Sequence, residues 1–269
     1  MRRPHWTALK LVVVLIYAFI LGPIAITTAV SFNAGARSVF PPVGFSLQWW
    51  KAAFLPQWTG PLLFSLELAA ITAAVSALGG ALLAFALQRY AFPGRAVLRT
   101  LALGPLLLPS LITGIALLQF LTLIGLVDWI GFPALLIGHV VICMPFSVRT
   151  TLVGLDALPP GLENAAASLG APRASVLRHV TLPLAMPGIA AGAIFAFVHS
   201  FDDVNLSLFV ARPGQQPITV AILAFVEYGF APTLAAVSIV SLLIPLALVA
   251  LFGKLVGIGN FLYEETGRG

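Results

Sequence analysis

Six long apolar runs limit what this sequence can fold into. A helix needs about 20 apolar residues to cross the hydrocarbon core of a bilayer. The chain has 269 residues, of which 60% are hydrophobic and 9% charged, and this composition excludes a soluble globular domain. We therefore predict an all-α, polytopic integral membrane protein with six transmembrane helices. The predicted spans cover residues 9–30, 61–87, 97–124, 133–154, 187–211 and 232–256.

The third run is interrupted by helix-breaking residues. Gly104-Pro105, Pro109 and Gly114 lie within it, so its hydrogen-bond ladder must be broken locally and satisfied by neighbouring helices. Such a break is typical either of a transport pathway or of a simple packing kink.

Two connections are predicted outside the membrane. Residues 31–60 carry Trp49, Trp50 and Trp58, which suit a belt at the level of the lipid headgroups or a short interfacial helix. A platform for stacking sugars or bases is the alternative. Residues 211–231 predict an external Pro-Gly turn followed by a helix that partly enters the membrane.

The basic residues predict the orientation of the chain. They are dispersed among short connections, so an isoelectric point near 9.9 reflects membrane topology and not nucleic-acid binding. With both termini in the cytosol, eleven of the 14 Lys and Arg residues are cytosolic and three are external, as the positive-inside rule requires. The first span is expected to remain uncleaved. The eleven are Arg2, Arg3, Lys10, Arg89, Arg95, Arg99, Arg149, Arg173, Arg178, Lys254 and Arg268, and the three are Arg37, Lys51 and Arg212.

Several kinds of site are absent from the sequence. Cys143 is the single cysteine, which excludes a disulfide framework and a C-x-x-C metal pair. There is no phosphate loop of the form G-x-x-x-x-G-K-S/T, no H-E-x-x-H and no G-x-S-x-G. His139 stands alone in an apolar run, where a packed or hydrogen-bonded histidine is more common than a metal ligand. We therefore expect no metal, no cofactor and no enzymatic activity in this chain.

Residues 162–188 form an amphiphilic segment between the fourth and fifth runs. The alanines at 165–167 favour a helix with minimal side chains that can lie closely against another protein. Gly170 suits the residue after a helix end, and Pro172 suits the start of a new helix over about residues 173–179. Leu182-Pro183 and Pro187 are expected to bend the chain into the next span. A loop lying on lipid headgroups is the alternative, although alanine and glycine make a poor anchor.

The spacing of this segment resembles the EAA loop of binding-protein-dependent ABC importer permeases. The matching positions are Ala165-Ala166, Gly170, Val180 and Leu182-Pro183. Two further stretches, RYAFPGR at 89–95 and GPLLLPSLITG at 104–114, are also typical of that family, and the resemblance covers roughly residues 60–250. It implies a type I permease fold with one transmembrane domain over residues 1–269.

The same resemblance implies that residues 156–186 form a cytosolic coupling segment, which sits in a cleft of an ATPase subunit. Asn164 stands where the family pattern has Glu, and Glu163 precedes it, so the sequence leaves open whether Glu163 supplies the carboxylate contact. The implied coupling residues are Leu162, Glu163, Asn164, Ala165, Ala166, Gly170, Ala171, Pro172 and Arg173.

Two adjacent carboxylates interrupt the fifth run. Asp202 and Asp203 cost several kcal/mol in an apolar helix unless they face water, a partner or a cation. At 1.5 Å per residue, Asp202 lies roughly 22 Å beyond Pro187, in the outer half of the bilayer. Neighbouring helical positions point about 100° apart, so one carboxylate can face the pathway while the other meets a neighbouring subunit.

The S-F-D-D stretch resembles the spermidine/putrescine branch of the permease family, which implies a cationic amine as substrate. Contact of Asp202 or Asp203 with substrate is one hypothesis, and structural pairing or capping of a broken helix is the other. The candidate residues of the substrate path are Ser200, Phe201, Asp202, Asp203, Asn205 and, more weakly, Glu67.

The function predicted is that of a permease subunit in a bacterial inner membrane, forming half of the path for a polyamine or related amine. The resemblance implies a second homologous permease, two copies of a cytosolic ABC ATPase that hold ATP and Mg, and an extracytoplasmic solute-binding protein, all without nucleic acid. A self-contained ion-coupled transporter or channel is the alternative, although inverted repeats are not evident. An intramembrane hydrolase is less suitable, because adjacent carboxylates on one helix do not face each other.

Overall fold

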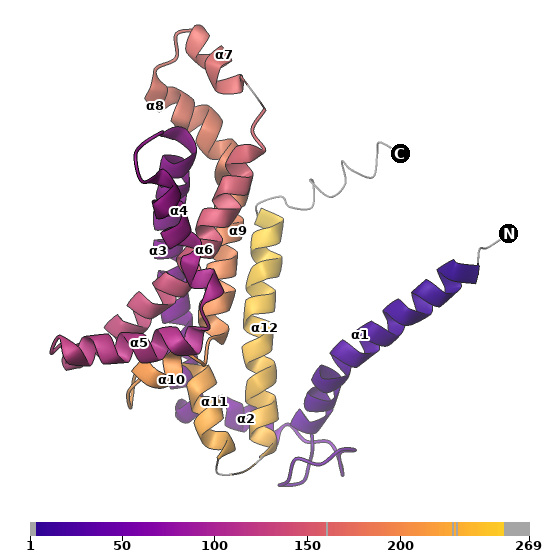
Figure 1. Ribbon diagram of the computed structural model, residues 1–269. Helices are drawn as coiled ribbons and strands as arrows, with labels where there is room; N and C mark the ends of the chain where they lie inside the picture. The colour runs from indigo at the N-terminus through magenta and orange to yellow at the C-terminus, as the bar shows by residue number, and fades with distance from the viewer. Residues whose placement is uncertain (1–3, 160, 228, 230, 256–269) are drawn as a thin grey trace. The chain divides into compact units, whose positions relative to one another are not determined.

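The computed structural model describes residues 4–159, 161–227, 229 and 231–255. Within these residues the chain is helical and has only two isolated β-bridges, so the predicted all-α class is confirmed. Figure 1 shows the elements in chain order. Their bounds are α1 Pro4–Ser31, α2 Gln48–Ala53, α3 Pro56–Arg89, α4 Arg95–Leu103, η1 Gly104–Leu107, α5 Ser110–Leu123, η2 Val127–Trp129, α6 Phe132–Asp156, α7 Leu162–Ser168, α8 Arg173–Val176, η3 Leu177–Thr181, α9 Leu182–Asp202, α10 Ser207–Val210, α11 Ile218–Val226 and α12 Pro232–Leu255.

The apolar runs become the long helices. Among the described residues, five helices are long and apolar enough to cross a membrane, or six if one bent pair is counted as a single span. The chain divides into two compact units. One consists of the described residues of 1–60 and 221–244, and the other of those of 61–220 and 245–269.

The third predicted span is not one straight helix. The segment formed by α4 and η1 meets α5 at an angle of 109°. Pro109 causes the break, because it lacks an N–H and its ring disfavours a helical conformation at Leu108, which is extended with ψ 132°. The predicted interruption of this run is confirmed.

The fifth span begins earlier and ends earlier than predicted. Helical structure runs without a break from Arg173 to Asp202. The segment η3 is a π-helical turn that ends at Thr181, two residues before Pro183, and its wider winding accommodates a residue that cannot donate to the helical ladder. The chain then leaves the helix at Asp203, where ψ is 122°. The prediction of a span reaching residue 211 is therefore wrong, because the helix ends at Asp202.

The helices α6 and α9 pack almost backbone to backbone in the larger unit. A Cβ atom on Gly192 would lie 2.6 Å from Oγ1 of Thr150 and 2.8 Å from Cα of Ser147. A Cβ atom on Gly154 would lie 3.2 Å from Cα of Gly188. Small residues therefore set the distance between these two helices, as is common where helices pack in membranes.

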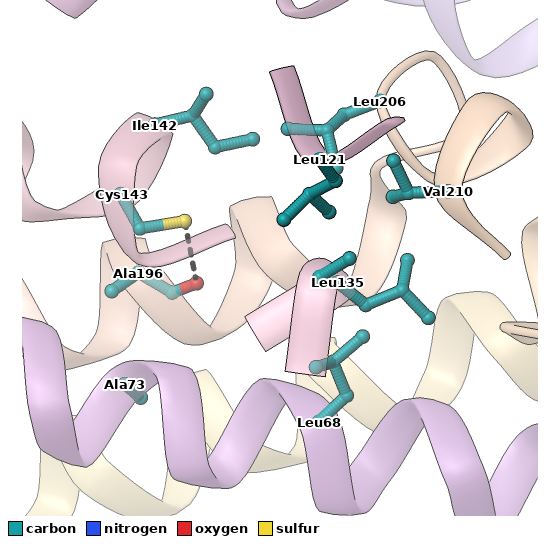
Figure 2. Packing of buried hydrophobic residues seen from close by; sticks show 10 residues of the cluster. Leu68, Ala73, Leu121, Leu135, Ile142, Cys143, Ala196, Leu206 and Val210 are labelled. Atoms are coloured by element: carbon teal, nitrogen blue, oxygen red, sulfur yellow. Dashed lines mark hydrogen bonds between the residues drawn. The ribbon is translucent and has the colours of Figure 1, made fainter. Parts of the chain in front are cut away.

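A buried apolar cluster joins α6 and α9 to the elements around them. Figure 2 shows leucines of α3, α5 and α6, together with Leu206 and Val210 at and within α10, beside the contact of Cys143 with the carbonyl oxygen of Ala196. This core fixes the end of α9, where the acidic pair lies. Its buried members are Leu68, Ala73, Leu121, Ala134, Leu135, Ile142, Cys143, Ala196, Leu206 and Val210.

The tryptophans of the smaller unit pack within that unit. Trp58 is only 3% exposed, and its ring lies 5.1 Å from that of Phe225. Trp50 stacks on Phe32, and Nε1 of Trp49 donates to the carbonyl oxygen of Asn33 over 2.7 Å. The predicted short helix is present as α2, but Trp58 is a core residue of its unit and not part of a surface belt.

Candidate functional site

The coupling segment has the predicted helix-turn-helix form. The helix α7 ends in a Schellman turn, in which the N–H of Ala171 donates to the carbonyl of Ala166 over 3.2 Å and that of Gly170 donates to Ala167 over 3.0 Å. Gly170 adopts a φ of +85°, a value that side-chain-bearing residues rarely take. The next helix then begins at Arg173, directly after Pro172.

The outer face of this segment is exposed. The segment lies at one end of the larger unit, beyond the ends of α3 and α6 (Figure 1). Leu169 is 90% exposed and Leu162 is 38% exposed. Asn164, Ala165, Gly170, Pro172 and Arg173 are also exposed, and Ala166 and Ala171 are half-buried. The surface offered is thus small and mainly apolar, which suits close contact with another protein.

Glu163 is engaged within the chain. Both terminal guanidinium nitrogens of Arg89, the last residue of α3, donate to its carboxylate, and the hydroxyl of Thr181 donates to it as well. The hydrogen bonds from Arg89 hold the pKa of Glu163 below its ordinary value of 4.5. The carboxylate of Glu163 therefore bridges α7 to α3 and to the turn that precedes α9.

A second contact reinforces this junction. Nε2 of Gln88 donates to Oδ1 of Asp156 over 2.7 Å, which connects the ends of α3 and α6. A polar pocket of about 320 Å³ lies beside the two contacts. It is lined by Gln88, Arg89, Leu155, Leu158, Pro159, Gly161, Glu163 and Asn164.

The two adjacent carboxylates have different surroundings. Asp203 is 6% exposed, and its Oδ2 accepts hydrogen bonds from the backbone N–H groups of Leu206 and Ser207 over 3.0 and 3.1 Å. Asp203 thus caps the turn that opens α10, in the manner of a residue at a helix N-terminus. Asp202, the last residue of α9, is exposed.

His139 joins three helices in the protein interior. Its Nδ1 lies 2.7 Å from the hydroxyl of Ser200 on α9, and its Nε2 lies 3.0 Å from the hydroxyl of Ser207 on α10. The ring is fully buried and lies 3.9 Å from the carboxylate of Asp203. The prediction of a packed, hydrogen-bonded histidine is confirmed, and among the described residues no group of His, Cys, Asp and Glu is suited to a metal.

The predicted path residues fall into two sets. Ser200, Phe201 and Asp203 are buried, at 2%, 3% and 6% exposure. Asp202, Asn205 and Glu67 are exposed. Only the second set has exposed side chains in this structure.

An aromatic face continues from Asp202 along α9. Phe195, His199 and Asp202 stand at i, i+4 and i+7 and therefore share one side of the helix. Phe146 of α6 covers the same side, with its ring centroid 6.4 Å from that of Phe195 and 5.2 Å from that of His199. Phe195 is 55% exposed. A face that combines ring surfaces with a carboxylate is chemically suited to an organic cation.

Sequence reasoning missed the roles of Arg89, Thr181 and Phe146. Arg89 is 74 residues from Glu163, and Thr181 is 18 residues from it. No local pattern connects such positions. The basic motif at 89–95 is the signal that could have drawn attention to Arg89.

Comparison with known proteins agrees with this architecture. A family model described as the binding-protein-dependent transport system inner membrane component matches residues 76–256. The chain is 34% identical over 238 residues to the spermidine/putrescine transport system permease protein PotC of Escherichia coli strain K12, covering 87% of this chain and 88% of the relative. It is 29% identical over 238 residues to the putrescine transport system permease protein PotI of the same strain, covering 85% and 84%.

Solved structures match the fold at lower identity. A bacterial ABC transporter involved in the import of the acidic polysaccharide alginate aligns with a TM-score of 0.72 and 17% identity, over 95% of this chain and 96% of that chain. The predicted all-α permease fold is confirmed. From the extent of the family match and the identity to PotC, the chain belongs to the family of binding-protein-dependent transport system inner membrane components.

Proposed function

We propose that this chain forms half of the translocation path of an ATP-driven importer for a polyamine or a related amine. The observation that carries the proposal is the 34% identity to PotC, a permease named for spermidine and putrescine transport, over 87% of the chain. PotI, named for putrescine, is similar over 85% of the chain. Because the similarity extends over nearly the whole chain, it includes the elements that carry the acidic pair.

The proposed assembly contains a second homologous permease, two copies of a cytosolic ABC ATPase and an extracytoplasmic solute-binding protein, within a lipid bilayer. ATP and Mg are held by the ATPase subunits, since this sequence has no phosphate-loop motif. The chain itself holds no cofactor, catalyses no reaction and binds no nucleic acid. The exposed surface around Leu162, Ala165 and Leu169 supports an ATPase docking site at α7.

We place the assembly in a bacterial inner membrane with both termini of this chain cytosolic, which puts α7 on the side of ATP. The excess of basic residues in the connections on that side supports this orientation. The chain forms one transmembrane domain over residues 1–269, with the coupling segment at 156–186. Pro160 of that segment, the tail at 257–269 and Arg2, Arg3 and Arg268 lie outside the described residues.

Asp202 is the residue we assign to the substrate. It is exposed at the end of α9, on the same side of that helix as the ring surfaces of Phe195 and His199, and Asn205 is exposed as well. A carboxylate attracts an ammonium group, and ring faces attract both a cation and the methylene groups attached to it. In the proposed mechanism, closure of the ATPase pair moves α7 and switches the path between inward-facing and outward-facing states.

The test is uptake of radiolabelled spermidine by proteoliposomes that contain the whole assembly. We expect ATP-dependent uptake that Asp202→Asn reduces by about tenfold, which corresponds to a loss of about 1.4 kcal/mol of interaction. Asp128→Asn, at another exposed carboxylate, serves as the matched control and should leave uptake unchanged.

Three outcomes contradict parts of the proposal. Uptake by the purified chain alone, driven by an ion gradient, identifies a self-contained transporter. Transport of other solutes but not of amines refutes the substrate class. Equal uptake by the Asp202→Asn and Asp128→Asn assemblies removes Asp202 from the path.

A further inference from the structure

The helix α7 has little apolar packing to hold it in place. It is seven residues long, and none of these residues is buried. A helix of this length is unstable by itself in water. Its ends are connected to the rest of the chain by turns at Gly161 and Gly170, both with positive φ. Side-chain contacts therefore have to determine where α7 lies.

Glu163 supplies those contacts. A carboxylate that accepts from both terminal nitrogens of one guanidinium group is held in a defined direction as well as at a defined distance. Thr181 donates to the same carboxylate and is itself only 2% exposed. The side chains of Arg89 and Glu163 are 36% and 24% exposed, so the pair is partly shielded from water and salt.

The two partners of Glu163 lie at the ends of the helices that carry the proposed path. Arg89 is the last residue of α3, and Thr181 directly precedes α9. The opposite end of α9 is Asp202, about 30 Å away at 1.5 Å per residue. Because the carboxylate of Glu163 contacts both ends, a displacement of α7 would move α3 and α9 together.

We propose that Arg89, Glu163 and Thr181 form a clamp that makes α7 move together with α3 and α9, and that Glu163 acts inside this chain and not as a contact to the ATPase. Arg89, Glu163 and Thr181 are positioning residues, which convert docking of a partner on α7 into movement of the membrane helices. The inference rests on the proposed function, since it assumes an ATPase docked on α7.

Charge exchange across the pair tests the clamp. The variants are Arg89→Glu, Glu163→Arg and the double variant, each co-expressed with the ATPase, the partner permease and the binding protein. Arg99→Glu, on the exposed surface of α4, controls for the change of charge. The measurements are co-purification of the ATPase, ATP hydrolysis, and the number of solute molecules transported per ATP in proteoliposomes.

We expect both single variants to retain the ATPase and to hydrolyse ATP, but to transport at least about tenfold less solute per ATP. The double variant should recover most of that loss, because it restores an ion pair with the signs reversed. Thr181→Val, which removes one donor, should give an intermediate loss. Where a single variant does not accumulate, Glu163→Gln, which preserves the side-chain shape, takes its place and should show the same uncoupling.

The results that overturn the clamp are distinct from those that overturn the proposed function. The clamp is refuted if the single variants transport as much solute per ATP as Arg99→Glu, or if the double variant is no better than the poorer single variant. Loss of ATPase co-purification in Glu163→Arg without recovery in the double variant identifies Glu163 as a partner contact. Failure of the wild-type chain to retain any ATPase instead removes the proposed function.

Discussion

Asp203 allows a quantitative test of the division between the two adjacent carboxylates. Its Oδ2 is the acceptor for the backbone N–H groups of Leu206 and Ser207 at the break after α9. Replacement by Ala leaves these two buried donors without an acceptor, at about 1–3 kcal/mol each. Removal of a buried charge offsets part of this cost. We therefore expect Asp203→Ala to destabilise the protein by roughly 2–5 kcal/mol.

Asn at the same position distinguishes the hydrogen bonds from the charge. The side-chain carbonyl of Asn accepts from the same two N–H groups, and Asn caps helices about as well as Asp. We expect Asp203→Asn to stay within about 1 kcal/mol of the native chain. Asp202→Ala, an exposed change one residue earlier, should stay within about 0.5 kcal/mol.

The assay is thermal unfolding of the purified protein in detergent, with the same heating rate for every variant. For chains of this size, 1 kcal/mol shifts the midpoint by about 2–4 °C, so Asp203→Ala should unfold roughly 4–20 °C lower than the native protein. A midpoint for Asp203→Ala that matches the native one refutes the capping role. A drop in the unfolding midpoint of Asp202→Ala as large as that of Asp203→Ala would contradict the structure, in which Asp203 is a capping residue and Asp202 is exposed.

Other predictions address the helix packing, the turn after α7 and the effect of pH. Gly192→Leu should lower the unfolding temperature, because an added Cβ would lie 2.6 Å from Thr150 and overpacking costs about 1–3 kcal/mol. Gly22→Leu is the control and should leave the unfolding temperature unchanged, because nothing lies within 4 Å of its added Cβ. Gly170→Val should cost about 1–2 kcal/mol locally because of its φ of +85°, and should reduce the amount of ATPase that co-purifies. The pKa of Glu163 in the folded protein is lowered, mainly by its hydrogen bonds from Arg89. The stability that the Glu163 carboxylate contributes is therefore complete above its ordinary pKa of 4.5, and it is lost as the pH falls through the lower pKa of the folded protein. The protection of the α7 amides from hydrogen exchange should therefore stay constant from pH 7 to about 5 and fall in stronger acid. In Glu163→Gln, which lacks the ionisable carboxylate, the protection should not show this loss in acid.

The local features of the fold were predictable from the sequence. The position of each apolar run indicates a membrane span, because the length and hydropathy of a single helix determine whether it can cross a bilayer. The turn at Gly170 was predictable for a similar reason, since a left-handed residue after a helix end favours glycine whatever surrounds it. The interruption at Pro109 also follows from the chemistry of one residue, although its angle of 109° does not.

Contacts between distant residues were decided by the tertiary structure. The sequence left open what Glu163 binds, and only the packing of helix ends brings Arg89 to it across 74 residues. A continuous fifth helix would point the side chains of Asp202 and Asp203 about 100° apart. In the structure, α9 instead ends between them, so Asp203 is buried and Asp202 is exposed. Apolar length and turn chemistry are properties of short segments and can be read in order along a chain. The partners of a buried or bridging polar group depend on which helices meet, and this is determined by the packing of the whole fold.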